Sequence, residues 1–166
     1  SVFIMEMKKY FRGMAKEQNG IFDNPRATLN VAQIAGGDAM NKVPSVCTLG
    51  FEMRLIDNRQ REKIMQAIAD IIKKNGFKAE VGIGISLPVT KCSDRKFISI
   101  VEGITKKTAV GVSYATEGSL LPNVNNFVIL GPGSIKVAHR ANERVSKSSL
   151  YKAVKVYGGL IDKFCV

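Results

Sequence analysis

The sequence predicts a mixed α/β protein that opens with most of a ferredoxin-like domain. Three observations support this fold class. Two segments in the first half repeat apolar residues with the period of an amphipathic helix, other segments alternate apolar and polar residues as strands do, and the pattern changes near residue 90. The first half reads helix, strand, strand, helix, strand, which is a split β-α-β unit without its first strand.

The first helix is expected within residues 1–20. Its apolar residues fall on one helical face at Phe3, Met7, Tyr10, Phe11 and Met14. Asn19 and Gly20 are expected to end it, since glycine readily takes the left-handed conformation that follows a helix.

Two strands are expected next. The segment "ATLNVAQIAGG", residues 27–37, is predicted to be a short strand that runs into a glycine turn. The clearest strand follows Val43, with apolar residues at Cys47, Leu49, Phe51, Met53 and Leu55. Glu52 and Arg54 alternate with them, so Arg54 is placed on the face away from the core.

A second amphipathic helix is expected over residues 57–76, with Asp57 or Asn58 as its cap and Gly76 as its end. Its inward residues are predicted to be Ile64, Ile68, Ile71 and Ile72. Residues 77–88 alternate like a third one-sided strand. The missing first strand indicates either that the chain begins inside a larger protein or that a partner supplies that sheet edge.

The second half follows a linker at residues 88–94 and has a different pattern. A helix is predicted around Phe97, Ile100, Val101 and Ile104, strands at 109–115 and 127–130, and a final helix from the cap Ser146. The continuous apolar run at 127–130 is typical of a strand buried on both faces. Two strands are too few for a separate sheet, so this half also looks incomplete.

Composition limits the class of protein without choosing a partner. The chain has 166 residues, is 45% hydrophobic and carries a formal charge of +11. Such a charge attracts nucleic acid, anionic membranes and anionic small substrates alike. No apolar stretch approaches the roughly 20 residues of a membrane-spanning helix and no secretory leader is recognisable, so we expect a soluble, cytoplasmic protein. Three widely spaced cysteines suggest neither a disulfide framework nor a cysteine zinc site.

His139 is the one histidine of the chain and lies in a loop after the apolar run at 127–130. Loops at the carboxyl ends of strands in α/β sheets collect ligands and catalytic groups. A lone histidine is nevertheless more often structural. A catalytic zinc ion needs about three protein ligands, and here the others would have to be carboxylates such as Glu117 or Glu143.

Other polar residues have both an ordinary and a functional interpretation. Arg54 is either a solvated side chain or a planar clamp for a carboxylate. Asn41, in "GGDAMNKVP", is either a turn residue or an amide that holds a substrate oxygen. Thr116 and Glu117, in "YATEG", fit an ordinary helix cap and first turn. The glycine-rich "GPGS" and "GIGIS" match no complete phosphate-binding fingerprint.

Together, these segments resemble a known family. "YATEGSLL" and "NFVILGPGSIKVAHRANERVS" are similar to the carboxyl-terminal signature of the zinc-dependent aminoacylase and carboxypeptidase family, which includes acetylornithine deacetylase and succinyl-diaminopimelate desuccinylase. The run "TEG...LGPG...AH...NE" is most similar to acetylornithine deacetylases. Upstream, "TLNVAQIAGGDAMNKVPSVCTLGFEMRLID" resembles the lid-domain hairpin of the same family.

The resemblance implies a domain plan and a set of roles. Residues 1–89 would be a partial ferredoxin-like lid that forms a homodimer, and residues 90–166 the carboxyl-terminal part of an α/β zinc-hydrolase catalytic domain. His139 would be the last ligand of a two-zinc centre, in which cobalt or manganese could replace zinc. Arg54 would bind the substrate carboxylate, Asn41 would contact the substrate and Thr116 would line its pocket. Glu117 stands where related enzymes often carry Ser-Asp.

The family's catalytic residues and its other metal ligands would precede Ser1, so none is expected in this chain. The resemblance therefore implies the carboxyl-terminal portion of a metal-dependent amidohydrolase that removes an acyl group from an N-acyl amino acid or cleaves a short peptide. Alone, the chain is expected to be inactive and to bind zinc poorly. The alternative is a non-catalytic, basic ferredoxin-like module for dimerisation or nucleic-acid binding. Against nucleic acid, the predicted strand faces lack the aromatic pairs that stack bases.

Overall fold

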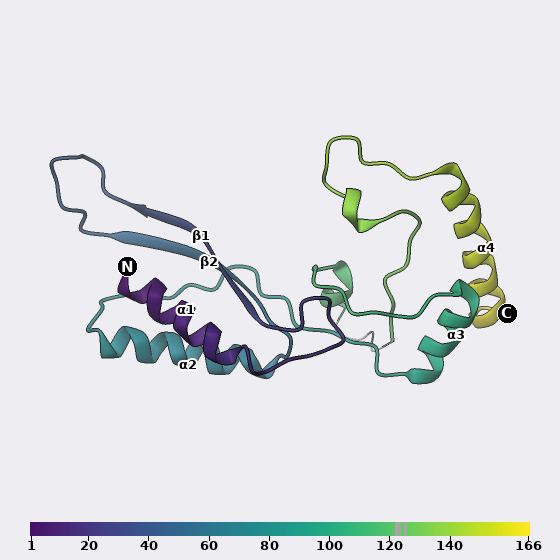
Figure 1. Cartoon of the computed structure of the whole chain (residues 1–166), viewed down its shortest axis with the longest axis horizontal. Helices are drawn as coiled ribbons and strands as arrows, with labels where there is room; N and C mark the ends of the chain where they lie inside the picture. Colours follow the sequence, from purple (N-terminus) through teal and green to yellow (C-terminus); the bar gives the residue numbers. More distant parts are fainter. Residues whose placement is uncertain (122–123, 125) are drawn as a thin grey trace. The chain divides into compact units, whose positions relative to one another are not determined.

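The computed structural model describes residues 1–121, 124 and 126–166, and these form two compact units (Figure 1). Unit 1 comprises Ser1–Val89 and Val110–Ala115, and unit 2 comprises Thr90–Ala109 and Thr116–Val166. The chain is a mixed α/β protein, as the sequence predicts, and its described sheet has two strands.

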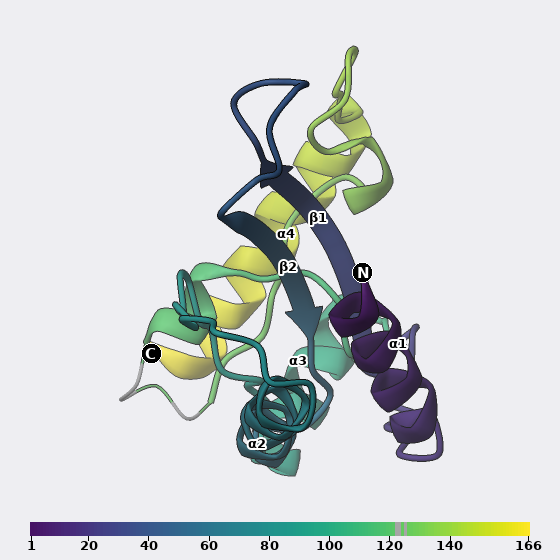
Figure 2. The same ribbon diagram turned by 90° about the vertical axis from the view of Figure 1, so that its left-hand side faces the viewer.

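Unit 1 is built from a β-hairpin and two helices in the order α1 (Val2–Met14), β1 (Thr28–Gly36), β2 (Cys47–Arg54) and α2 (Arg59–Lys74). Both helices pack on one face of the hairpin (Figure 2). This confirms the predicted helix–strand–strand–helix order. The predicted first helix ends at Met14, earlier than Asn19 and Gly20. Its next residue, Ala15, keeps a right-handed conformation instead of forming a glycine cap.

The two strands pair antiparallel, and a β-bulge keeps their apolar residues on one face. Val31 lies opposite Phe51, and Ile34 lies opposite Leu49, with a register shift between Val31 and Gln33. Cross-strand partners share a face, and Leu49 and Phe51 are two residues apart. The extra residue of the bulge therefore returns Ile34 to the face of Val31, which strict alternation along β1 would not do.

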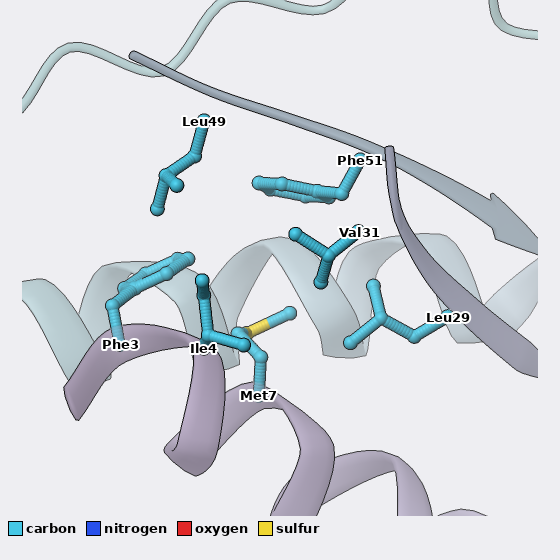
Figure 3. A pocket seen from close by; sticks show the side chains of 7 residues that line it. All are labelled: Phe3, Ile4, Met7, Leu29, Val31, Leu49 and Phe51. Carbon is cyan, nitrogen blue, oxygen red and sulfur yellow. The ribbon is translucent and has the colours of Figure 1, made fainter. Parts of the chain in front are cut away.

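The core of unit 1 lies between α1, α2 and this sheet face. Its buried cluster consists of Met7, Phe11, Met14, Ile64, Ile68 and Ile71. Leu29, Phe51 and Met53 pack against it from the strands. A small apolar hollow remains between α1 and the hairpin, where Met7 faces Leu29 and Phe51 (Figure 3). The residues predicted to face inward on both helices therefore do so.

One buried polar side chain, Gln60, ties the start of α2 to the chain after α1. Its Oε1 accepts a hydrogen bond from the backbone N–H of Ile56 at 3.1 Å, and its Nε2 donates to Glu17 at 3.0 Å. Lys63 also donates to Glu17 at 3.0 Å. The hydrogen bond from Gln60, followed by that from Lys63, lowers the pKa of Glu17 below its ordinary value.

The predicted third strand at residues 77–88 is wrong. Two hydrogen bonds hold this segment near its ends: the N–H of Phe77 donates to the carbonyl of Ile72, and the N–H of Val89, the next residue after the segment, donates to the side chain of Asn58. Between these points the segment has alternating residues but no ladder, and Ile85 is exposed. Alternation describes a half-buried surface, whereas a strand also needs a neighbour with which to exchange hydrogen bonds.

Unit 2 contains α3 (Arg95–Thr105), the 3-10 helices η1 (Glu117–Leu120) and η2 (Ile135–Val137), and α4 (Lys147–Phe164). Both predicted α-helices of this half are confirmed, and Ser146 caps α4 by accepting from the N–H of Ser149. Phe97 and Phe164 bring α3 and α4 together with ring centroids 5.4 Å apart.

The two strands predicted for the second half are also wrong. Residues 127–130 are not part of a strand, and the carbonyl of Leu130 accepts a hydrogen bond from the Tyr157 hydroxyl. Residues 110–115 belong to unit 1, where Gly111 forms a single parallel bridge with Phe22. Both segments are short apolar runs with exposed residues such as Val110 and Ile129, and such a run does not by itself show whether a strand partner is present.

No helix within residues 1–121, 124 and 126–166 combines the length and apolar character needed to cross a membrane.

Candidate functional site

The four residues singled out in the sequence fall in two units. Asn41 and Arg54 lie in unit 1, and Thr116 and His139 lie in unit 2. Three of them are exposed and Thr116 is half-buried, so none belongs to the hydrophobic core. Side chains outside the core can contact a ligand, and each of the four is described within its own unit.

Arg54 is the last residue of β2 and points away from the helices. Its neighbour Met53 packs against the core, so the period of the strand puts Arg54 on the opposite face, as predicted. The Arg54 side chain is 60% exposed, and its Nε donates to Oε1 of Glu52 at 2.9 Å. Its Nη1 donates to the backbone carbonyl of Ser113 at 3.3 Å.

The guanidinium of Arg54 thus keeps three of its five N–H groups for a ligand, one on Nη1 and two on Nη2. Nε and Nη1 are engaged, whereas Nη2 has no hydrogen-bond partner in the described part of the chain. A guanidinium stays charged at all physiological pH values and directs its N–H groups in a fixed plane. This geometry suits a carboxylate oxygen that approaches Nη2 from solvent.

Asn41 lies at the tip of the β1–β2 hairpin, in the connection formed by residues 37–46. Asn41 lies within a turn over residues 39–42, because the N–H of Lys42 donates to the carbonyl of Ala39 at 3.4 Å. Lys42 also pairs with Asp38 at 3.3 Å. Gly37 starts the connection at a φ of 87°, which favours glycine. The exposed Asn41 amide can both donate and accept hydrogen bonds.

Thr116 precedes the short helix η1 and is only in part the helix cap that the sequence predicts. It occupies the N-cap position, but its side chain makes no capping hydrogen bond. Its carbonyl accepts from the N–H of Ser119 at 3.0 Å. Gly118 packs so closely against Phe127 that a Cβ would lie 2.5 Å from the ring. The "TEG" glycine is therefore required by this contact.

His139 follows η2 in a tight turn. Its backbone has a φ of 57°, in the left-handed region, and its N–H donates to Oε2 of Glu143 at 3.2 Å. The turn continues with the N–H of Glu143 donating to the carbonyl of Arg140 at 3.1 Å. The sequence suggested Glu143 as a second metal ligand, but here its carboxylate accepts the hydrogen bond from the backbone N–H of His139. The imidazole itself is exposed.

The described residues do not form a metal centre by themselves. Within residues 1–121, 124 and 126–166, no group of three or more His, Cys, Asp or Glu side chains comes together. A catalytic zinc site takes about three protein ligands. His139 can supply one nitrogen to such a site, and further ligands would have to come from outside these residues.

Sequence reasoning missed the two partners of Arg54. Glu52 was visible in the pattern as the residue two positions before Arg54, and such residues share a strand face. Opposite charges at that spacing could have indicated the pair. Ser113 contributes a backbone carbonyl, which carries no signal in the side-chain sequence.

Comparison with known proteins identifies the family. Residues 3–80 match the family model described as a peptidase dimerisation domain, M20_dimer. The chain is 31% identical over 168 residues to an acetylornithine deacetylase of Buchnera aphidicola subsp. Acyrthosiphon pisum, with 98% of this chain and 44% of that protein covered. It is 27% identical to an acetylornithine deacetylase of Pasteurella multocida, with the same coverage. The chain belongs to the M20 family.

A solved structure agrees with the M20 assignment at the level of the fold. A metallo-carboxypeptidase of the M20 family from Sulfolobus solfataricus is similar with a TM-score of 0.57 and 18% identity, over 95% of this chain and 43% of that one. The chain spans less than half the length of the relatives it matches. The relatives that it matches are hydrolases.

Proposed function

We propose that this chain is the carboxyl-terminal portion of a metal-dependent amidohydrolase that removes the acyl group from an N-acyl amino acid. The leading activity is acetylornithine deacetylation, with cleavage of a short peptide as the other reaction of this class. Arg54 is the observation that carries the proposal. The guanidinium of Arg54 is exposed and keeps free N–H groups that can bind a carboxylate. The chain that carries it is 31% identical to an acetylornithine deacetylase.

Each site residue receives one role in this proposal. Arg54 binds the carboxylate of the substrate, the Asn41 amide binds a substrate oxygen and Thr116 lines the substrate pocket. His139 is a metal ligand through its neutral imidazole. The metal is zinc, as two ions in the complete enzyme, with cobalt or manganese able to replace it, and the remaining ligands and the catalytic base lie outside this chain.

The proposal extends to the assembly. Residues 1–89 form a ferredoxin-like lid and dimerisation domain, and residues 90–166 form part of the catalytic domain. The match of residues 3–80 to a peptidase dimerisation domain supports a homodimer through the lid. The formal charge of +11 produces a positive field that attracts the carboxylate group of the substrate. We place the enzyme in the cytoplasm, without a membrane or nucleic-acid partner.

The test is steady-state hydrolysis of N-acetylornithine by the full-length enzyme. Arg54→Gln removes the charge that would bind the substrate carboxylate. Arg61→Gln, at an exposed position of α2, is the matched control. A hydrogen bond to a charged group contributes about 1.5–3 kcal/mol, so we expect KM to rise at least about tenfold for Arg54→Gln. Arg61→Gln should leave KM within about twofold of the parent.

Metal dependence is measured in the same assay. Chelation should abolish hydrolysis and added zinc should restore it. An Arg54→Gln enzyme with the KM of the parent would remove Arg54 from substrate binding. Full activity after exhaustive chelation would contradict the metal-dependent class.

A further inference from the structure

Two acceptors from distant parts of unit 1 meet at the Arg54 guanidinium. Oε1 of Glu52 lies 2.9 Å from Nε, and the carbonyl oxygen of Ser113 lies 3.3 Å from Nη1. Glu52 is local, because residues two apart on a strand project from the same face. Ser113 is 59 residues away in sequence. An arginine on an exposed strand face is thus fixed at two of its three nitrogens.

The Ser113 carbonyl is held in place by a close backbone approach. The N–H of Gly111 donates to the carbonyl of Ile21 at 2.9 Å, and Gly111 forms a parallel bridge with Phe22. A Cβ on Gly111 would lie 2.5 Å from the Ile21 oxygen. The segment that supplies the second acceptor can therefore dock here because residue 111 is glycine.

These contacts have a consequence for recognition. A free arginine side chain loses considerable rotamer entropy when it binds a ligand, and a guanidinium already held in position loses less. With Nε–H and one N–H of Nη1 occupied, the second N–H of Nη1 and both N–H groups of Nη2 are left for a ligand. A carboxylate then meets donors that are already held in place instead of a mobile side chain.

We propose that Glu52 is a positioning residue for substrate binding. It orients the guanidinium of Arg54, together with the Ser113 carbonyl, so that Nη2 is presented to the carboxylate of an N-acyl amino acid. This inference rests on the proposed role of Arg54. In this role the Glu52 carboxylate stays bound to Arg54 while the substrate binds. The opposite role would be competition, in which the substrate carboxylate has to displace the Glu52 carboxylate from Arg54.

The experiment compares two substrates in the full-length enzyme. N-acetylornithine carries the carboxylate, and its carboxamide analogue does not. Glu52→Gln keeps the shape of the side chain and an amide oxygen as acceptor, but removes the charge that strengthens the contact. Glu62→Gln, at an exposed position of α2, makes the same charge change away from Arg54.

We expect Glu52→Gln to raise KM for N-acetylornithine roughly three- to fivefold, the upper part of the range of an exposed ion pair, with kcat unchanged. KM for the carboxamide and both constants of Glu62→Gln should stay at parent values. In an Arg54→Gln background, Glu52→Gln should have no further effect on KM, because the group that it positions is gone.

The outcomes separate this inference from the proposed function. If Arg54→Gln raises KM and Glu52→Gln does not, the positioning role of Glu52 is overturned while Arg54 keeps its function. A KM for Glu52→Gln below that of the parent would mean that Glu52 competes with substrate, which also overturns the inference. If Arg54→Gln itself leaves KM unchanged, the proposed function of Arg54 fails and the role of Glu52 fails with it.

Discussion

The core of unit 1 predicts a large difference between two chemically identical substitutions. Ile64 is fully buried in the cluster between α1 and α2, with 0% of its surface exposed, whereas Ile85 in the unpaired segment is 93% exposed. Replacing isoleucine by alanine removes three carbon atoms. At about 0.8 kcal/mol for each buried carbon, Ile64→Ala loses about 2.4 kcal/mol of transfer free energy.

The cavity left in the cluster adds to this loss, so the free energy of unfolding should fall by about 3–4 kcal/mol in Ile64→Ala. Ile85→Ala removes almost no buried surface and should change the free energy of unfolding by less than about 0.5 kcal/mol. Urea unfolding followed by circular dichroism measures both, with the slopes compared to exclude a change in the denatured state. If Ile64→Ala unfolds at all urea concentrations, Ile64→Val, expected to cost about 1 kcal/mol, replaces it. Equal midpoints for Ile64→Ala and Ile85→Ala would refute this placement of the core.

Three further predictions follow from the packing, the carboxylates and the ligand set. Gly111→Ala should lower the urea midpoint of unfolding and raise KM for N-acetylornithine, because its Cβ would collide with the Ile21 carbonyl. Gly84→Ala, whose Cβ would meet nothing within 4 Å, is the control. A Gly111→Ala variant with the midpoint and KM of the parent would contradict the close approach of Gly111 to Ile21. The pKa of Glu6 is lowered chiefly by the hydrogen bond from Lys74 and that of Glu17 chiefly by the hydrogen bond from Gln60. The unfolded chain therefore binds more protons than the folded chain, and the stability that these two carboxylates supply, which is present above their ordinary pKa of 4.5, should be lost as the pH falls below that value. Urea midpoints measured at pH 7 and pH 3.5 test this. Glu17→Gln should reduce the difference between the two midpoints. Isothermal titration should find no tight zinc site in the isolated chain, because its described residues gather no ligand set, and micromolar one-to-one binding lost in His139→Ala would contradict that expectation.

Helices were predictable from the sequence by the period of their apolar residues, even in α4, which has no buried residue. In α2, Ile64, Ile68 and Ile71 repeat with the helical period and are all buried. Gly76 follows the helix at a φ of 65°, as a glycine stop should. Local pattern and tertiary packing agree in this element.

Strands were predictable only where their partner is also present. β1 and β2 are joined by a short connection and pair with each other, so period two was sufficient to place Phe51 and Met53 inward. Residues 77–88 and 127–130 have comparable apolar patterns without a ladder. Hydrogen bonding between strands depends on residues elsewhere in the sequence, and no local pattern reports whether they are there.

The candidate site, like the unpaired segments, depends on partners that the local sequence pattern does not reveal. The chemistry of Arg54 and His139 could be suggested by residue type, but their partners come from backbone geometry: a carbonyl at Ser113 for the guanidinium and a left-handed turn at His139. Since Arg54, Asn41 and His139 are exposed and Thr116 is half-buried, substitution of these side chains removes little buried surface. A loss of activity in such a variant with an unchanged unfolding midpoint would therefore report on binding or catalysis. The same loss in an Ile64 variant would report on folding, and the two kinds of residue can be separated by measuring both quantities in each variant.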